Sequence, residues 1–368
     1  MKILQIGKFW PVLGGVEKVM FDLTHGLSAR GIECDMLCAS SDNKKQEIRL
    51  NEYGCVTAVP SLLKASGTMI APAMVSHLRR IAHHYDIIHI HHPDPMAALA
   101  LFMCGYKGKV VLHWHSDILR QKILLHAYRP LQSWLLRRAD TVICTSPNYA
   151  KGSRELCRVA DKLQCVPIGV APVITDSKAV SEARKLTGER KIVFSLGRMI
   201  PYKGFDNLIL AARYLPDDYA VVIAGSGPLY EPLRKLVADN GLESKVYMPG
   251  RISDELRNAL MEAASVFCLP SVERTEAYGI VLIEAMSAGT PVVATEIPGS
   301  GTSWVNAHGI SGLNAPCGSP HRLAEAIIKV TEKSDGPNSY GHNARKRWQE
   351  LFTIDTFIDN ITAVYRQL

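Results

Sequence analysis

The sequence of 368 residues contains no run of about 18 uncharged apolar residues, the length that a membrane-spanning helix requires. Residues 1–7 have the pattern of a buried strand and are followed at once by Lys8. They lack the apolar core and the small-residue cleavage site of a signal peptide. These absences predict a cytoplasmic protein.

The sequence also lacks CxxC pairs, HxxxH helices and paired-Asp DxD motifs. Its nine cysteines, an odd number, stand mostly in apolar runs, as Cys34 and Cys268 do. This usage predicts reduced core thiols rather than disulfides or a zinc site. We therefore expect no metal and no other cofactor, and no nucleic-acid partner.

Basic charge is concentrated in the first half of the chain. Residues 1–165 hold 21 Lys and Arg against 13 Asp and Glu, a net charge of +8. Of the 42 basic and 35 acidic residues in the chain, 21 and 22 remain for the second half, a net charge of −1. A negatively charged partner is therefore expected for the first half.

Short runs rich in Val and Ile alternate with helical patterns, which predicts parallel sheets covered by helices. The expected strands are 2–6, 33–39, 87–91, 110–113 and 141–145, followed by 191–196, 220–224, 245–248, 266–269 and 291–294. Two such series, in a chain longer than one hydrophobic core usually organises, predict two doubly wound α/β domains.

The domain boundary is expected in residues 166–188, which contain Pro and Gly and have weak periodicity. We assign residues 1–170 to the first domain and 171–345 to the second. Residues 346–368 are expected to form a terminal helix that packs back on the first domain. Ligands of doubly wound sheets bind beyond the carboxyl ends of the strands, so the loops that follow the strands are expected to hold the chemistry.

Two glutamates flank the start of a short helix that Gly279 begins and Gly289 ends. Eight helical positions would turn Glu276 and Glu284 about 80° apart, so a shared ligand requires Glu276 to lie in the loop. The free N–H groups at the start of such a helix attract an anion such as a diphosphate. The alternative is that Glu276 only caps the helix and Glu284 is a solvated helix residue.

Two cations stand on the loop that follows the strand 191–196. Arg198 comes directly after Gly197, and Lys203 lies at the opening of the next helix, where its charge opposes the helix dipole. Together they can bind two phosphates and stabilise a departing nucleotide diphosphate. The alternative is two solvated surface cations.

Glycines follow two further strands. Gly225 and Gly227 come after the strand 220–224, where a tight turn can bring backbone close to a nucleotide, although a plain turn explains the same pattern. Gly14 and Gly15 come after the first strand and would expose backbone amides to the same phosphates.

Histidines end two strands of the first domain. One histidine of the segment 113–117 (His-Trp-His-Ser-Asp) is expected to point into a ligand-binding cleft at the ends of the strands, although single histidines at strand ends are more often structural. The trio His89, His91 and His92 is interpreted as structural.

Taken in order, these motifs resemble those of glycosyltransferase family four, which is retaining and has the GT-B fold of two Rossmann-like domains facing across a cleft. The resemblance rests on Gly14-Gly15, His115, Val166-Pro-Ile-Gly169-Val, the Gly-Arg-x-x-x-x-Lys-Gly loop from Gly197, Gly225-Ser-Gly-Pro, Glu276-x7-Glu284, and Ser311-Gly-Leu before a terminal helix. It covers nearly the whole chain.

The resemblance implies roles for the side chains that match the family's motifs. The residue matching Glu276 contacts the transferred sugar, the one matching Glu284 holds the ribose hydroxyls, and those matching Arg198 and Lys203 bind the diphosphate. The one matching His115 reaches the sugar near the anomeric centre. The remaining donor-binding positions, mostly backbone, are Gly14, Gly15, Gly197, Gly225, Gly227, Arg251, Ile252, Tyr278, Gly279, Ile280 and Val281.

The resemblance further implies front-face substitution without a metal, in which the leaving diphosphate helps to deprotonate the acceptor. Base contacts in the family are largely made by backbone, so UDP and GDP remain open.

For the acceptor, the segment 118–138 combines apolar residues with cations, which suits a surface facing anionic lipid. These cations are Arg120, Lys122, Arg129, Arg137 and Arg138. We therefore expect a lipid-linked oligosaccharide or lipopolysaccharide-type acceptor and a peripheral position on the cytoplasmic face of the inner membrane. An ordinary core-facing helix with a basic outer face is the alternative.

Other functions stay open on the sequence. A soluble transferase or synthase acting on a small sugar or glucan would need no basic membrane face. A non-catalytic sugar-binding subunit would keep the fold but has no need of both glutamates, the two cations and His115. A dinucleotide-dependent dehydrogenase fits worse, because no GxGxxG follows the first strand.

Overall fold

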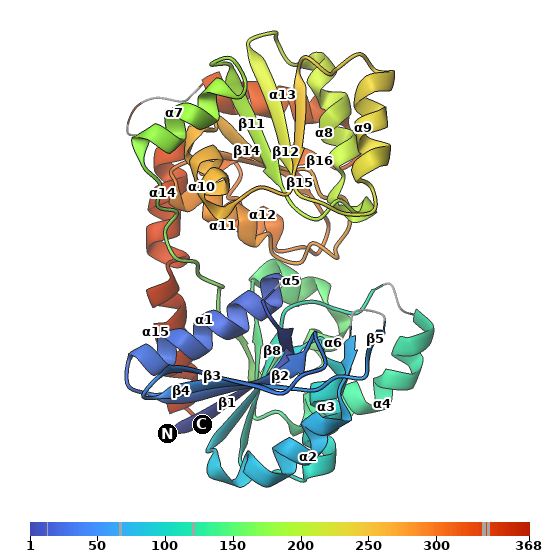
Figure 1. Ribbon diagram of the computed structural model, residues 1–368, viewed down its shortest axis with the longest axis vertical. Helices are drawn as coiled ribbons and strands as arrows, with labels where there is room; N and C mark the ends of the chain where they lie inside the picture. Colours follow the sequence, from blue (N-terminus) through green and yellow to red (C-terminus); the bar gives the residue numbers. More distant parts are fainter. Residues whose placement is uncertain (13, 66–67, 120–121, 333–335, 337–338) are drawn as a thin grey trace. The chain divides into compact units, whose positions relative to one another are not determined.

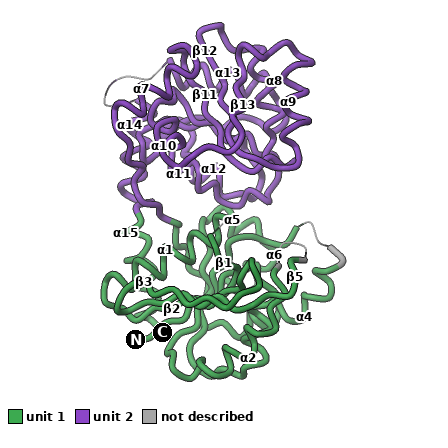
Figure 2. The backbone as a smooth tube through the Cα atoms, viewed as in Figure 1, with its two compact units in different colours: residues 1–168, 354–368 green, residues 169–353 purple. Residues whose placement is uncertain are grey.

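The computed structural model describes residues 1–12, 14–65, 68–119, 122–332, 336 and 339–368. It divides into two compact units, one formed by residues 1–168 and 354–368 and the other by residues 169–353 (Figure 2). Each unit is a sheet covered by helices on both faces. No described helix has the length and apolar character needed to cross a bilayer.

The first unit contains an eight-stranded sheet in the order β10-β9-β8-β7-β1-β2-β4-β3, parallel except for the β3–β4 pair (Figure 1). Its strands are β1 Lys2–Trp10, β2 Glu33–Ser40, β3 Gln46–Asn51, β4 Gly54–Val59, β7 Ile87–His92, β8 Lys109–Trp114, β9 Thr141–Cys144 and β10 Leu163–Cys165. A separate hairpin pairs β5 Leu63–Ala65 with β6 Thr68–Ile70. Its longer helices are α1 Gly15–Ala29, α2 Pro72–Ile81, α3 Pro95–Cys104, α4 Lys122–Arg138 and α15 Ile354–Arg366, and its shorter ones are α5 Pro147–Gly152 and α6 Arg154–Cys157.

The second unit contains a six-stranded parallel sheet in the order β13-β12-β11-β14-β15-β16. Its strands are β11 Lys191–Leu196, β12 Tyr219–Ala224, β13 Val246–Gly250, β14 Val266–Leu269, β15 Val292–Glu296 and β16 Gly312–Pro316. Its helices are α7 Ser177–Lys185, α8 Phe205–Ala211, α9 Tyr230–Asp239, α10 Asp254–Ala263, α11 Ile280–Ser287, α12 Thr302–Val305, α13 Pro320–Glu332 and α14 Tyr340–Leu351.

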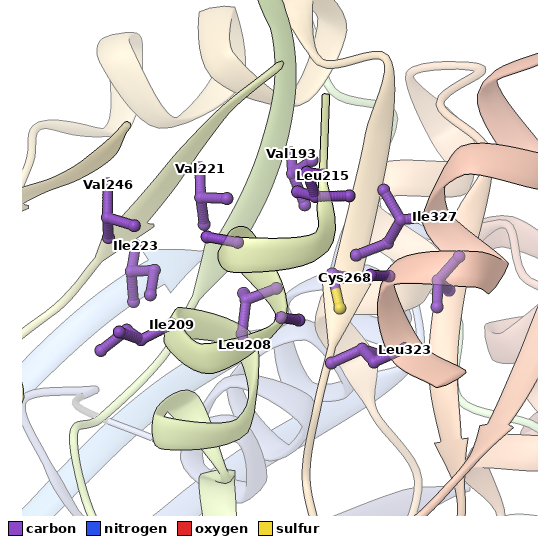
Figure 3. Close-up of a cluster of buried hydrophobic side chains, with 14 of the residues drawn as sticks. Val193, Leu208, Ile209, Leu215, Val221, Ile223, Val246, Cys268, Leu323 and Ile327 are labelled. Carbon is purple, nitrogen blue, oxygen red and sulfur yellow. The ribbon is translucent and has the colours of Figure 1, made fainter. Parts of the chain in front are cut away.

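Alternation along the strands explains why helices cover both faces of this sheet. Val193 and Val221 point to the face that α8 and α13 cover, where they meet Leu208 and Ile327 (Figure 3). The next residue along β11, Phe194, points to the opposite face and packs edge-on against a phenylalanine of β14 at a ring distance of 5.7 Å. Because both faces are apolar, the strands read as continuous Val and Ile runs, as expected for a buried parallel sheet.

All ten predicted strands are present, and only β1 differs by more than two residues at an end. β1 continues to Trp10 through Gly7 and Lys8, which have φ angles of 139° and 56°. The pairing with β2 shifts there, and the Lys8 N–H donates to the Asp94 carboxylate instead of to the sheet. Strands β3–β6, β10 and β16 are not predicted by the periodicity.

The C-terminal segment differs from the expectation of one terminal helix over residues 346–368. It contains two helices, because the backbone at Phe352 leaves helical geometry and its carbonyl accepts the Val170 N–H at 2.9 Å. The first helix, α14, stays in the second unit, where Arg347 donates to the Trp304 carbonyl at 2.7 Å. Only α15 belongs to the first unit, where Arg30 forms an ion pair of 2.7 Å with Asp355.

Candidate active site

A buried ion pair is the main charged feature at the carboxyl ends of the second sheet. Lys203 Nζ lies 2.6 Å from Glu276 Oε2, and each side chain is only 11% exposed. Lys203 follows β11 and Glu276 follows β14, and these strands are neighbours in the sheet. Ser271 Oγ also donates to Glu276 Oε2 at 2.9 Å. The sheet order thus joins two residues 73 positions apart in the sequence.

Glu276 keeps Lys203 charged despite its burial. Burial by itself lowers the pKa of the Lys203 ammonium, but the adjacent Glu276 carboxylate more than offsets this, so that the pKa is raised above its ordinary value. The sequence predicts an anion beside Lys203 but does not identify Glu276 as that anion. Arg198, on the same loop, is exposed and forms no ion pair with a described residue.

The glycines of the neighbouring loops allow backbone to approach backbone. A Cβ at Gly225 would lie 1.9 Å from the Gly197 carbonyl oxygen, and a Cβ at Gly204 would lie 2.2 Å from the Pro270 carbonyl oxygen. At Gly227 the nearest atom would be the Met199 carbonyl oxygen, at 2.5 Å. The glycines are therefore needed to interlock the loops after β11, β12 and β14, which fixes the positions of Arg198 and Lys203.

Helix α11 begins next to this ion pair. Gly279 occupies its N-cap position with a φ of 82° and no side chain caps the helix, so the amides of Ile280 and Val281 have no helical partner. Glu276 lies in the preceding loop, as expected, and Glu284 projects from the second turn. The remaining expected residues also follow neighbouring strands: Arg251 and Ile252 after β13, Gly225 and Gly227 after β12, and Tyr278 after β14.

In the first unit, Gly14 and Gly15 start α1 directly after β1, as expected. Gly14 is the N-cap, and both glycines are exposed. The buried side chain of Glu17 folds back over this end, so that a Cβ at Gly14 would lie 2.4 Å from Glu17 Oε2. A carboxylate therefore already lies at the amide end of α1, a feature that the sequence pattern does not predict.

His115 lies directly after β8 and is 5% exposed. Its Nε2 is 2.9 Å from His91 Nδ1, and its ring is stacked at 4.2 Å on His113. Burial lowers the pKa values of His91 and His115 well below their ordinary range, so both rings are neutral. The expectation that His91 is only structural did not include this direct bond to His115.

The described residues contain one group that could hold a metal, His91, His113 and His115, with one nitrogen of each within 4.8 Å of the others. The planes of His91 and His113 lie within 13° and 14° of the plane of His115. A metal bound by an imidazole lies in the plane of its ring, and stacked rings do not direct their nitrogens to one point. This geometry is poor for coordination.

The expected membrane-facing cations are only partly exposed. Arg129 and Arg137 of α4 are exposed, whereas Arg138 donates to the Gly108 carbonyl at 2.6 Å and pairs with Asp140 at 3.2 Å. Arg138 therefore holds the end of α4 on the loop before β8, a role that the sequence does not predict. Arg120 and the side chain of Lys122 lie outside the described residues. Helices α3 and α4 also carry exposed apolar side chains, namely Leu99, Phe102, Met103 and Leu124.

Comparisons with known proteins agree with this arrangement. Residues 13–173 match the family model described as Glycosyltransferase Family 4, and residues 176–347 match the one described as Glycosyl transferases group 1. The O-antigen chain mannosyltransferase C of Escherichia coli is 32% identical over 374 residues, covering 100% of this chain and 99% of the relative. The D-rhamnosyltransferase WbpZ of Pseudomonas aeruginosa is 33% identical over 358 residues, covering 96% and 92%.

A solved structure extends the similarity to the fold. Anabaena HepE in complex with UDP has a TM-score of 0.79 to this chain at 22% identity, with 100% of both chains covered. The predicted fold of two Rossmann-like domains is thereby confirmed as GT-B. The chain belongs to glycosyltransferase family four and is a glycosyltransferase of the type that builds bacterial surface polysaccharides.

Proposed function

We propose that the chain transfers mannose, or a 6-deoxy sugar of the same configuration, from a nucleotide diphosphate sugar to a lipid-linked saccharide acceptor, with retention at the anomeric carbon. The sugar is inferred from relatives whose names specify mannosyl and D-rhamnosyl transfer, since D-rhamnose is 6-deoxymannose. The donor base, guanine or uracil, is left to the test below.

The observation that supports this function best is the buried Lys203–Glu276 pair beside the uncapped start of α11. A diphosphate at that helix end meets free amides, the Lys203 ammonium and Arg198. As the glycosidic bond breaks, negative charge grows on the diphosphate, and these groups stabilise it in a site of low dielectric. In this proposal Glu276, which bonds to Lys203, contacts the transferred sugar.

The proposal of retention rests on the resemblance to family four, in which the leaving diphosphate accepts the proton of the acceptor hydroxyl on the face from which it departs. The anomeric configuration of the product, measured by NMR, tests this step. An inverted product would contradict the front-face mechanism.

A thermal-shift panel with UDP, GDP, ADP and their sugars tests the donor. A ligand at 100 times its dissociation constant stabilises the protein by about 2.7 kcal/mol, so the true donor should stand out. Stabilisation without any transfer to lipid-linked or small-sugar acceptors would instead identify a non-catalytic binding subunit. Transfer to small sugars alone would favour the soluble enzyme.

The acceptor proposal rests on exposed apolar and basic side chains of the neighbouring helices α3 and α4. They are Leu99, Phe102 and Met103 of α3 and Leu124, Arg129 and Arg137 of α4. Phe102 is 52% exposed although its ring packs edge-on against Trp134 at 4.9 Å. Apolar side chains that enter the acyl boundary, next to cations that attract anionic headgroups, suit an enzyme that takes its acceptor from a membrane surface.

A further inference from the structure

Four buried side chains form a hydrogen-bonded chain from the C-terminal helix to His115, entirely within the first unit. Gln5 Nε2 donates to the Tyr365 hydroxyl at 3.0 Å, and Gln5 Oε1 lies 2.8 Å from His91 Nε2. His91 Nδ1 then lies 2.9 Å from His115 Nε2. The four residues come from β1, β7, α15 and the end of β8, so only the folded unit assembles this chain.

The chemistry of each member fixes where the protons lie. A neutral imidazole has one N–H and one acceptor nitrogen. Gln5 presents its oxygen to His91, so His91 Nε2 carries the proton and His91 Nδ1 is an acceptor. His115 must then donate from Nε2, which leaves its Nδ1 with a free lone pair.

We propose that Gln5, His91 and Tyr365 are positioning residues that hold His115 in the tautomer with its proton on Nε2, so that Nδ1 accepts a hydrogen bond from a hydroxyl group of the donor sugar. The proton arrangement stands on the contacts alone, whereas the hydroxyl ligand rests on the proposed function. An acceptor nitrogen selects a hydroxyl and disfavours a phosphate oxygen, which has no proton to donate. His115 would thereby help to orient the sugar end of the donor rather than its diphosphate.

The opposite tautomer requires the Gln5 amide to turn over. His91 would then face an N–H₂ group and accept at Nε2, so its proton would lie on Nδ1. His115 would accept at Nε2 and carry its own proton on Nδ1. The amide nitrogen donates to the Tyr365 hydroxyl and, at 3.8 Å, lies near Cys34 Sγ. The Tyr365 hydroxyl also bonds to His89 Nδ1, and with its proton in that bond its oxygen can only accept from Gln5, which opposes the rotation. Removing the Tyr365 hydroxyl is therefore expected to change the tautomer of His115 through Gln5 and His91.

Selective ¹⁵N labelling of histidine, read by long-range ¹H–¹⁵N correlation, tests the tautomer directly. In the wild type, His115 should appear as one neutral form with Nδ1 unprotonated. In Tyr365→Phe and Gln5→Met, the second tautomer should become populated. Tyr106→Phe is the matched control, because it removes a part-buried hydroxyl of the same unit that donates to the Tyr85 carbonyl at 2.9 Å, outside the chain.

Binding provides the functional readout. The nucleotide sugar binds only the competent tautomer, so its dissociation constant and KM should rise in Tyr365→Phe by roughly two- to tenfold, the range that one net hydrogen bond supplies. The parent UDP or GDP lacks the sugar and should bind as in the wild type, and kcat should change little. Equal weakening of sugar and parent nucleotide would show a general structural effect and overturn the proposal.

The tautomer result separates this inference from the proposed function. His115 with its proton on Nδ1 in the wild type, or an unchanged tautomer in both Tyr365→Phe and Gln5→Met, overturns the hydrogen-bonded chain even if sugar transfer is confirmed. If no nucleotide sugar binds at all, the proposed function fails while the proton arrangement is still measured.

Discussion

The carboxyl ends of the two sheets carry opposite kinds of chemistry, and neither follows the net charge of its half of the chain. Residues 1–165 have a net charge of +8, yet the candidate residue after β8 is a neutral histidine bonded to other neutral groups. The second half has a net charge of −1, yet its loops carry the Lys203–Glu276 pair and Arg198. Net charge thus describes the outer surface, whereas the site depends on which few groups the fold buries together.

The physical reason lies in what burial requires of each group. A buried ammonium needs a carboxylate partner to stay charged, and Lys203 has one. A buried histidine without a carboxylate becomes neutral, and its two nitrogens then differ as donor and acceptor. The second unit is therefore suited to an anion that gains charge, and the first to a neutral hydroxyl.

The largest expected effect comes from breaking the ion pair on one side only. Lys203→Met leaves the Glu276 carboxylate buried without its ammonium, which should cost about 3–5 kcal/mol of unfolding free energy and lower kcat/KM at least tenfold. The double variant with Glu276→Gln should recover most of the stability, measured by urea unfolding, but none of the activity. Lys191→Met, which removes an exposed pair of 2.9 Å with Asp218, is the control and should change both little. Full activity in the double variant would exclude a catalytic role for the pair.

Arg198→Ala should separate rate from stability more cleanly, because its side chain is exposed and pairs with no described residue. Loss of one charged hydrogen bond to the diphosphate is worth roughly 1.5–3 kcal/mol, or about ten- to a hundredfold in kcat/KM. Steady-state kinetics and thermal unfolding measured together check this. A large drop in the unfolding temperature, or no loss of rate, would mean that Arg198 does not bind the diphosphate.

The sequence predicts the fold well because its strongest signal, apolar runs alternating with helices, reflects strands buried on both faces. It predicts which loops hold Arg198, Lys203, Glu276 and His115, because those loops follow strands. It does not predict that Lys203 pairs with Glu276 or that His91 bonds to His115. These contacts depend on which strands are neighbours, and strand order is not written in local periodicity.

Arg138 shows the same limit on the surface. A basic residue at the end of an amphipathic helix reads as a solvated cation, but the structure directs it to two backbone carbonyls of a loop distant in sequence. Among the described cations of this segment, Arg129 and Arg137 are exposed.

Membrane binding should therefore respond to both kinds of side chain in the first unit. Each exposed Arg near an anionic leaflet contributes about 1 kcal/mol, so Arg129→Gln with Arg137→Gln should weaken flotation with anionic liposomes by roughly tenfold or more at low salt. Phe102→Ser with Leu124→Ser should also weaken flotation. This loss should be similar at low and high salt, because the lost contact is apolar. A matched pair, Arg213→Gln with Lys235→Gln, removes two cations from the second unit and should float as the wild type does. Equal flotation of all these variants, or none of the wild type, would favour a soluble acceptor.

The smallest expected effect is that of removing divalent metal. The two units lead to different expectations for this experiment. If the ammonium and guanidinium of the second unit stabilise the diphosphate, no divalent cation is needed there, and transfer should continue unchanged after dialysis against EDTA. The cluster of His91, His113 and His115 in the first unit offers the competing explanation, since its nitrogens are ligands that zinc accepts. Elemental analysis of the purified protein and activity after EDTA, with Mg²⁺, Mn²⁺ and Zn²⁺ added back separately, distinguish the two.

Activity that is abolished by EDTA and restored by Mg²⁺ or Mn²⁺ would mean that the phosphate site has been misread. Stoichiometric zinc that His113→Phe removes would instead place a metal among the histidines, and His115 would then be a ligand rather than a hydrogen-bond acceptor.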